Sequence, residues 1–347
     1  AIYWFLFTLS LLFTPIDLEI IIAQAMFYFT EIAGLSKIGM IIFKQNEILN
    51  LFELLDSEEF QGDEEMPMKI VNDNKVYYLK YWKACAIFYY TGSFFLLFLP
   101  VFEHFFGNVD LIFPLCQYYF LSDNIRDSYF TIIFLYQFFG LFVLITCNVN
   151  IDTFICGLLL MAITQYKVLN WKLSNLCLKP TELSLNREEQ DKILMNRLNK
   201  YLKHYDQVLR YCRDMQKIMG FSIFAQFGTG AATICVSMCT FLRPMTNEDW
   251  MFMGCYIGAM TLEIFLPGLL GAQLTQESAD LAYAVYCSDW ISQPENFKRN
   301  LRLMVESANK PIVVTGLQMF SLSLETFASI IKMAYSFFTL LKNVQAD

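Results

Sequence analysis

The sequence predicts an all-α polytopic membrane protein with seven transmembrane helices. Of its 347 residues, 56% are hydrophobic and 17% are aromatic, and the mean hydropathy is +0.41. Soluble domains contain about 45–50% apolar residues, so a large soluble helical protein is the disfavoured alternative. Seven apolar runs, the first of them short, can supply the roughly 20 residues that a span needs. Charged or turn-forming segments separate these runs.

The seven runs define the predicted spans in chain order. The first already begins at Ile2 and no Met precedes it, so we expect an N-terminal stretch before it. A turn at Pro15 separates the first run from the second. The predicted spans are residues 2–13, 18–43, 82–102, 129–166, 218–242, 250–274 and 312–341.

The fourth run is longer than a bilayer requires. From Tyr129 to Leu176 a single helix would extend about 70 Å, at about 1.5 Å per residue. Either this helix projects beyond the membrane, or the polar residues Asn148, Asn150 and Asp152 divide it into two spans. The distribution of basic residues distinguishes the two arrangements.

Lys and Arg collect on the cytoplasmic side of membrane proteins. With one long fourth helix, residues 44–83, 167–217 and 276–311 share one side, and they carry 20 of the 25 Lys and Arg residues. An extra span would move the first of these segments to the other side. The count therefore predicts a single fourth helix, a cytosolic N-terminus and an extracellular C-terminus.

The segments between spans divide the chain. Residues 1–166 are expected to hold helices one to four and an inner loop at 44–81, which should be partly helical. Residues 167–217 repeat apolar side chains near helical spacing and should extend the fourth and fifth helices into the cytosol. The remaining predicted units are helices five and six at 218–275, cytosolic anchor helices at 276–310, split at Ser292-Gln293-Pro294, and the last helix at 311–347.

Sequence signatures of enzymes are absent. The two His residues, His104 and His204, have no metal-ligand partner three or four residues away. The ten Cys residues form no C-x-x-C pair, and the chain has no G-x-S-x-G, Walker-type or G-x-G-x-x-G motif. We therefore expect no enzymatic activity, no metal, no cofactor and no nucleic-acid partner.

The C-terminal third carries a recognisable pattern. "YAVYCSDW" is followed by "KRNLRLMVESANKPIVVTGLQMFSLSLETFASIIKMAYSFFTLL". The combination of Pro311, the run 321–324, Thr326-Phe327, Lys332, Tyr335-Ser336 and Leu340-Leu341 resembles the C-terminal end of insect odorant receptors. The related gustatory receptors differ in this last helix.

The resemblance implies a function and partners. Insect odorant receptors are ligand-gated, non-selective cation channels in the plasma membrane of olfactory sensory neurons. They are tetramers, usually built from a tuned receptor and a shared co-receptor. The cytosolic helices form the layer where subunits meet, the seventh helix lines a central pore, and a small volatile ligand binds between helices in the outer half of the membrane domain. This chain would be the tuned, odorant-binding subunit.

The last helix has two kinds of candidate residue. Glu325 and Lys332 lie seven residues apart, on nearly one face, and charged groups in spans face a protein interior or an aqueous path. They fit a helix beside a pore, or a structural polar contact within the subunit. Near its outer end, where the resemblance implies a hydrophobic constriction, the predicted gate residues are Leu340 and Val344, with Asn343 and Phe337 as the competing candidates.

The predicted odorant pocket draws on the outer halves of several helices. An apolar volatile needs an apolar cavity with few polar groups, and Tyr and Ser hydroxyls would orient a carbonyl or an alcohol. For each residue taken singly, helix packing is the alternative role. The predicted ligand-binding residues are Met26, Phe27, Phe29, Tyr90, Ser93, Phe94, Tyr136, Phe139, Gly140, Tyr256 and Met260.

Three other functions compete with this interpretation. One is a transporter, and the internal repeats that transporters often carry are not detected in this sequence. A gustatory-type receptor channel shares the topology, and the Tyr335-Ser336 ending argues against it. A seven-helix G-protein-coupled receptor requires an extracellular N-terminus, which the distribution of basic residues opposes.

Overall fold

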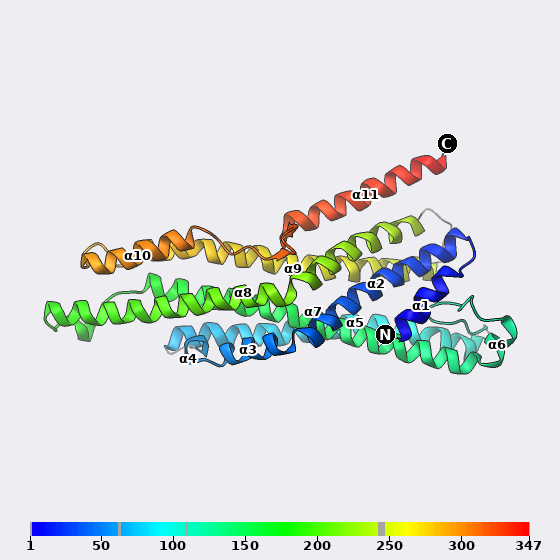
Figure 1. Ribbon diagram of the computed structural model, residues 1–347, viewed down its shortest axis with the longest axis horizontal. Coiled ribbons are helices and arrows are strands. Elements are labelled where there is room, and N and C mark those ends of the chain that lie inside the picture. The colour runs from blue at the N-terminus through cyan, green and yellow to red at the C-terminus, as the bar shows by residue number, and fades with distance from the viewer. Residues whose placement is uncertain (1, 62–63, 108–109, 242–246, 347) are drawn as a thin grey trace.

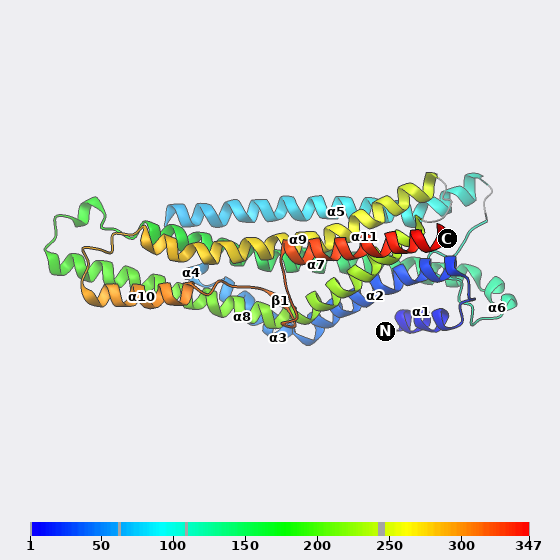
Figure 2. The same ribbon diagram turned by 90° about the horizontal axis from the view of Figure 1, so that it is seen from above.

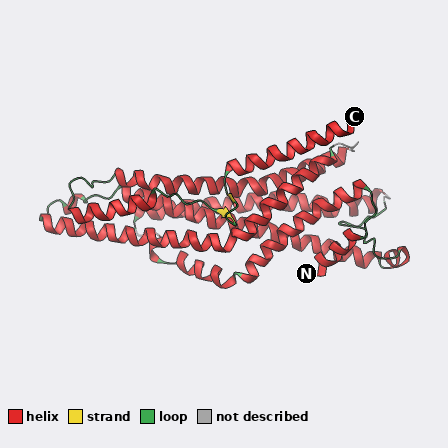
Figure 3. Cartoon of the chain, turned by 45° about the horizontal axis from the view of Figure 1, so that its top comes forward, coloured by secondary structure: helices red, strands yellow, loops and turns green. Residues whose placement is uncertain are grey.

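Long helices run along an elongated molecule (Figure 1). The computed structural model describes residues 2–61, 64–107, 110–241 and 247–346. Within these ranges the regular elements are helices, apart from one small pair of strands (Figure 3). Five of the described helices, α2, α5, α7, α8 and α9, are long and apolar enough to cross a membrane.

Together with α1 and α11, these five helices correspond in order to the seven predicted spans. The elements are α1 (Ile2–Leu12), α2 (Leu18–Phe43), α3 (Gln45–Leu55), α4 (Glu58–Gln61), α5 (Glu65–Gly107), α6 (Asp123–Ser128), α7 (Phe130–Ser174), η1 (Pro180–Glu182), α8 (Arg187–Thr240), α9 (Asn247–Tyr286), α10 (Glu295–Ala308), β1 (Thr315–Gly316), β2 (Phe320–Ser321) and α11 (Leu324–Ala346). The all-α, multi-pass architecture predicted from the sequence is confirmed.

The fourth predicted span is one unbroken helix. At about 1.5 Å per residue, the 45 residues of α7 extend about 68 Å. Several of its polar side chains bond to carbonyls of the helix itself, which is compatible with an unbroken helix. Asn150 Nδ2 donates to Thr146 O (2.8 Å), and Thr153 Oγ1 donates to Val149 O (2.8 Å). The prediction of a single long fourth helix is confirmed.

The segments expected outside the membrane are also largely helical. α8 continues for 54 residues, so it contains both the predicted extension and the fifth span. The inner loop folds into α3, α4 and the start of α5. Phe60 of α4 is buried against the rings of His204 and Tyr211 on α8, and Gln165 of α7 donates to its carbonyl (3.0 Å). Both views place α3, α4, α10 and the beginning of α8 toward one end of the molecule, and α6 and the C-terminus toward the other (Figures 1 and 2).

The seventh span starts later than the sequence predicts. α11 begins at Leu324, not at residue 312. The preceding segment forms an antiparallel pair in which Thr315 faces Ser321 and Gly316 faces Phe320. Leu317 and Gln318 adopt positive φ angles of 49° and 62° in the turn, a conformation that costs free energy in a helix-forming run. The predicted helix is therefore wrong over its first twelve residues.

A side chain from α8 explains why this segment is extended. Gln216 Nε2 donates to Thr315 O (2.6 Å), and Gln216 Oε1 accepts from Thr315 N (2.9 Å). The amide thus occupies both backbone groups of Thr315, as a neighbouring strand would. α9 fixes the same segment, because Thr275 Oγ1 donates to Ile312 O (2.9 Å) and Ser278 Oγ accepts from Ile312 N (2.9 Å). We name residues 311–323 the tethered segment.

Candidate functional site

A cavity of about 690 Å³ lies between α2, α5, α7 and α9. Aromatic and aliphatic side chains form most of its wall, among them Phe88, Phe95 and Leu141. Three acids and one amide also line it, namely Glu31, Asp152, Glu263 and Asn148. This combination of an apolar wall with a few polar groups is typical of small-molecule sites, which occupy about 300–1,000 Å³.

The eleven predicted ligand-binding residues fall into three groups. Phe27, Ser93, Tyr256 and Met260 line this first cavity. Tyr136, Phe139 and Gly140 line a second cavity of about 530 Å³, together with residues of α1 and α2. Met26, Phe29, Tyr90 and Phe94 line neither cavity. The structure thus divides one predicted pocket into two neighbouring ones.

Helical register explains the residues that lie outside both cavities. Tyr89 lines the first cavity in place of Tyr90, because successive residues on a helix point about 100° apart. The ring of Phe94 stacks on that of Phe98, with centroids 4.9 Å apart. Met26 is buried, and its sulfur accepts a hydrogen bond from Ser237 Oγ (3.1 Å).

Three hydroxyl groups of the cavity wall already donate within the protein. Ser93 Oγ donates to Tyr89 O (2.6 Å), and Tyr89 Oη donates to Ala259 O on α9 (3.2 Å). Tyr256 Oη of α9 donates to Met26 O on α2 (3.2 Å) and lies 2.8 Å from Thr30 Oγ1. The bonds of Tyr89 and Tyr256 join α9 to α5 and to α2. They also leave the oxygen lone pairs, rather than the protons, available to a ligand.

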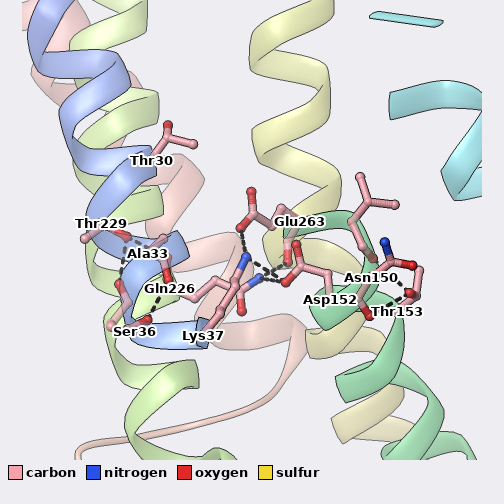
Figure 4. A network of polar contacts seen from close by, with 12 residues as sticks. Thr30, Ala33, Ser36, Lys37, Asn150, Asp152, Thr153, Gln226, Thr229 and Glu263 are labelled. Atoms are coloured by element: carbon pink, nitrogen blue, oxygen red, sulfur yellow. Dashed lines mark hydrogen bonds and ion pairs between the residues drawn. The ribbon is translucent and has the colours of Figure 1, made fainter. Parts of the chain in front are cut away.

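A buried cluster of charges joins four helices beside the cavity (Figure 4). Lys37 Nζ of α2 lies 2.7 Å from Asp152 Oδ1 of α7 and 2.5 Å from Glu263 Oε1 of α9. Gln226 of α8 donates to Asp152 Oδ1 (3.3 Å) and to Glu263 O (3.0 Å). The side chain of Lys37 is 0% exposed, so its charge depends on these partners. We name Lys37, Asp152 and Glu263 the charge triad.

Sequence reasoning missed the charge triad, although the sequence contains a signal for it. Each of its three residues is a charged side chain in a long apolar run, and such charges pair with one another inside membrane proteins. One base and two acids in three different spans are the pattern that indicates such a contact. Their pairing across helices required the three-dimensional arrangement.

The predicted residues of the last helix lie mostly on its exposed side. α11 contacts α8 and α9, and Ile330 and Ala334 are buried there. Glu325, Lys332 and Asn343 are exposed in the isolated chain. Phe337 and Leu340 are 43% and 60% exposed, whereas the side chain of Val344 lies outside the described residues. Within the described chain, no ion pair involves Glu325 or Lys332.

Comparison with known proteins gives the family. A sequence model of the family described as "7tm Odorant receptor" matches residues 18–335. The chain belongs to the 7tm odorant receptor family. Odorant receptor 46a, isoform B, of Drosophila melanogaster is 25% identical over 91% of this chain and 81% of its own length. Odorant receptor 2a of the same species is 26% identical over 61% of this chain, and the match spans 55% of that receptor.

The fold of this odorant receptor also matches solved structures. The insect olfactory receptor OR5 from Machilis hrabei superposes with a TM-score of 0.84 at 17% identity, over 98% of this chain and 85% of that one. The same receptor in complex with eugenol gives a TM-score of 0.82 at 16% identity, over 99% and 86%. The recognition of an insect odorant receptor and of a multi-pass membrane protein is confirmed.

Proposed function

We propose that this odorant receptor is the odorant-binding subunit of a heterotetrameric, ligand-gated, non-selective cation channel. Its partner is the shared co-receptor subunit, its ligand is a small volatile molecule, and its place is the plasma membrane of olfactory sensory neurons. The observation that carries this proposal is the apolar cavity of about 690 Å³ between α2, α5, α7 and α9. It has the size and lining of a site for a small apolar ligand.

A solved receptor of the same fold supports the nature of the ligand. OR5 from Machilis hrabei forms a complex with eugenol, which is a small aromatic molecule. In this receptor, the rings of Phe88, Phe95 and Tyr256 line the first cavity and offer contact area for a ligand of that type. The ligand-binding group predicted from the sequence is retained here for the residues that line this cavity, namely Phe27, Ser93, Tyr256 and Met260.

We assign the pore to α11. Its exposed side has no partner within the described chain, and in a tetramer the same face of four subunits can surround one axis. Glu325 and Lys332 then face water or a neighbouring subunit. Leu340 and Val344 would form a hydrophobic constriction that closes by dewetting, and Phe337 and Asn343 are the competing candidates for the gate.

The orientation in the membrane follows from the basic residues. The segments that carry 20 of the 25 Lys and Arg residues include α3, α10 and the first half of α8, which lie toward one end of the molecule (Figure 1). Placing that end in the cytosol satisfies the positive-inside rule. The N-terminus is then cytosolic and the C-terminus extracellular, and epitope tags at both ends of the chain test this orientation.

Expression with and without the co-receptor tests the channel function. Cells that express both chains should give odorant-evoked cation current, and cells that express this chain alone should give none. Met260→Trp should reduce the response because the larger ring fills the first cavity. The matched control is Phe94→Trp, which alters a ring that lines neither described cavity. Robust current from this chain alone would refute obligate pairing. An equal loss of response in Met260→Trp and Phe94→Trp would show that the first cavity is not the ligand site.

A further inference from the structure

Glu31 is a buried acid whose carboxylate oxygens have no hydrogen-bond partner among the described residues. It lies on α2 and is 2% exposed. Neither Oε1 nor Oε2 accepts a hydrogen bond from any group in the described chain. A buried carboxylate without a partner is costly, so such a group in a membrane span indicates a function.

The position of Glu31 connects it to the candidate ligand site. It lines the first cavity and also the second, and Leu144 of α7 is shared in the same way. Glu31 therefore belongs to the partition between the two cavities. A ligand in the first cavity can approach the carboxylate without leaving the apolar space.

A second unpaired acceptor lies on the facing helix. Asn148 lines the first cavity, and its Oδ1 is buried with no donor among the described residues. Gly34, one turn after Glu31, allows α7 to come close. A Cβ added to Gly34 would lie 2.9 Å from Leu144 Cδ1 and 3.4 Å from both polar atoms of the Asn148 amide. Glu31 and Asn148 thus offer three acceptor atoms from facing helices.

The nearby positive charge is used elsewhere. The ammonium of Lys37 contacts Asp152 and Glu263 at 2.7 and 2.5 Å, and these two carboxylates also line the first cavity. One Lys therefore faces two acids, and Glu31 adds a third acid to the cavity wall. The resulting field favours a cation over an anion or a neutral molecule.

From these contacts we infer that the ligand of the first cavity is a protonated primary amine with an apolar body. The ammonium group supplies three N–H donors and a positive charge, which match the three unpaired acceptors on Glu31 and Asn148. The aromatic wall takes the apolar body. The cavity hydroxyls of Ser93, Tyr89 and Tyr256 already donate within the protein, so they favour a ligand that donates over a ketone or an ester. This inference rests on the proposed odorant-gated channel and specifies its ligand.

Three ligands with one carbon skeleton test the inference: ethylbenzene, 2-phenylethanol and 2-phenylethylamine. They are applied to cells that express this chain with the co-receptor, and current is measured against concentration. Because hydrogen bonds to a charged group are the stronger ones, the amine should act at a concentration at least about tenfold lower than the alcohol. The hydrocarbon should be the weakest of the three.

Glu31→Gln removes the charge and keeps the shape of the side chain. It should bring the amine and the alcohol to within about threefold of each other, because a neutral amide acceptor does not distinguish the two ligands by charge. Glu47→Gln is the matched control, since the Glu47 side chain on α3 is 44% exposed, and it should leave the amine preference intact. Surface labelling of each variant shows whether it folds and reaches the membrane.

The outcomes separate this inference from the channel proposal. Equal potency of amine and alcohol in the unmodified receptor overturns the amine assignment and leaves the channel intact, whether or not Glu31→Gln folds. An amine preference that survives Glu31→Gln also overturns it. If neither this series nor a broad odorant panel evokes current with the co-receptor, the channel proposal fails and the inference fails with it.

Discussion

Replacing Lys37 by Met should be among the most destabilising single changes in this receptor. The Lys37 side chain is 0% exposed and contacts two carboxylates, at 2.7 and 2.5 Å. Met has a similar length but no charge, so Asp152 and Glu263 would remain buried beside each other without a counter-ion. Breaking a buried ion pair by removing one partner costs about 3–5 kcal/mol, a large part of the roughly 5–15 kcal/mol that stabilises a typical domain.

The control is a Lys with the same chemistry at the surface. Lys44 Nζ lies 2.9 Å from Glu47 Oε1, and the two side chains are 40% and 44% exposed. Exposed pairs contribute about 0–1 kcal/mol, so Lys44→Met should have little effect. At about 2 °C per kcal/mol for a large chain, Lys37→Met should lower the melting temperature by roughly 6–10 °C and the control by at most about 2 °C.

The assay is thermal unfolding of the detergent-solubilised protein, followed by size-exclusion chromatography of a fluorescent fusion. Adding Asp152→Asn to Lys37→Met removes one of the two unpaired acids, so the double variant should regain part of the lost stability. Equal melting temperatures for Lys37→Met and Lys44→Met would refute the buried triad. A double variant no more stable than Lys37→Met would show that charge is not the cause.

Two further predictions concern α11 and its base. Glu325→Gln and Lys332→Gln should each change the free energy of unfolding by less than about 0.5 kcal/mol, because both side chains are exposed in the isolated chain. Both variants should alter the calcium permeability of the channel. Unchanged permeability in both would place the two residues outside the ion path. Gly271→Ala should cost about 1–3 kcal/mol, because the new Cβ would lie 2.3 Å from Leu322 O. Gly258→Ala on the same helix, with no atom of the described residues within 4 Å of the new Cβ, should be neutral in the same thermal assay.

The helices that cross the membrane could be predicted well from the sequence. The second apolar run predicts a helix over residues 18–43, and α2 is Leu18–Phe43, because the length of an apolar run sets such a helix. The distribution of Lys and Arg predicts the single long α7. Apolar residues near helical spacing predict the extension that forms the first half of α8. Pro294 correctly marked the break before α10, where it is the N-cap residue.

The last span shows what composition cannot predict. Residues 312–323 continue the apolar run of the last span, so composition predicts a helix there. The backbone is extended instead, because Gln216 and Thr275, both distant in sequence, bind it. The candidate site was limited in a similar way. A run of aromatic residues indicates an apolar pocket, but register decides between Tyr89 and Tyr90. The charge triad and the unpaired Glu31 depend on which helices face each other, and this is a property of the packing.

The contact between α8 and the tethered segment also determines which residues can vary there. Gln216 binds main-chain atoms of Thr315, on the N–H and on the carbonyl, so the identity of the residue at 315 is free to change provided its N–H is kept. Position 216 has no such freedom. A Glu at position 216 would place a carboxylate oxygen against the Thr315 carbonyl oxygen, and both atoms are acceptors. An Asn has the amide but is one methylene shorter, so it would not reach Thr315 from the same backbone position. The primary amide of Gln216 thus makes the attachment to α8, whereas Thr275 and Ser278 make the attachment to α9.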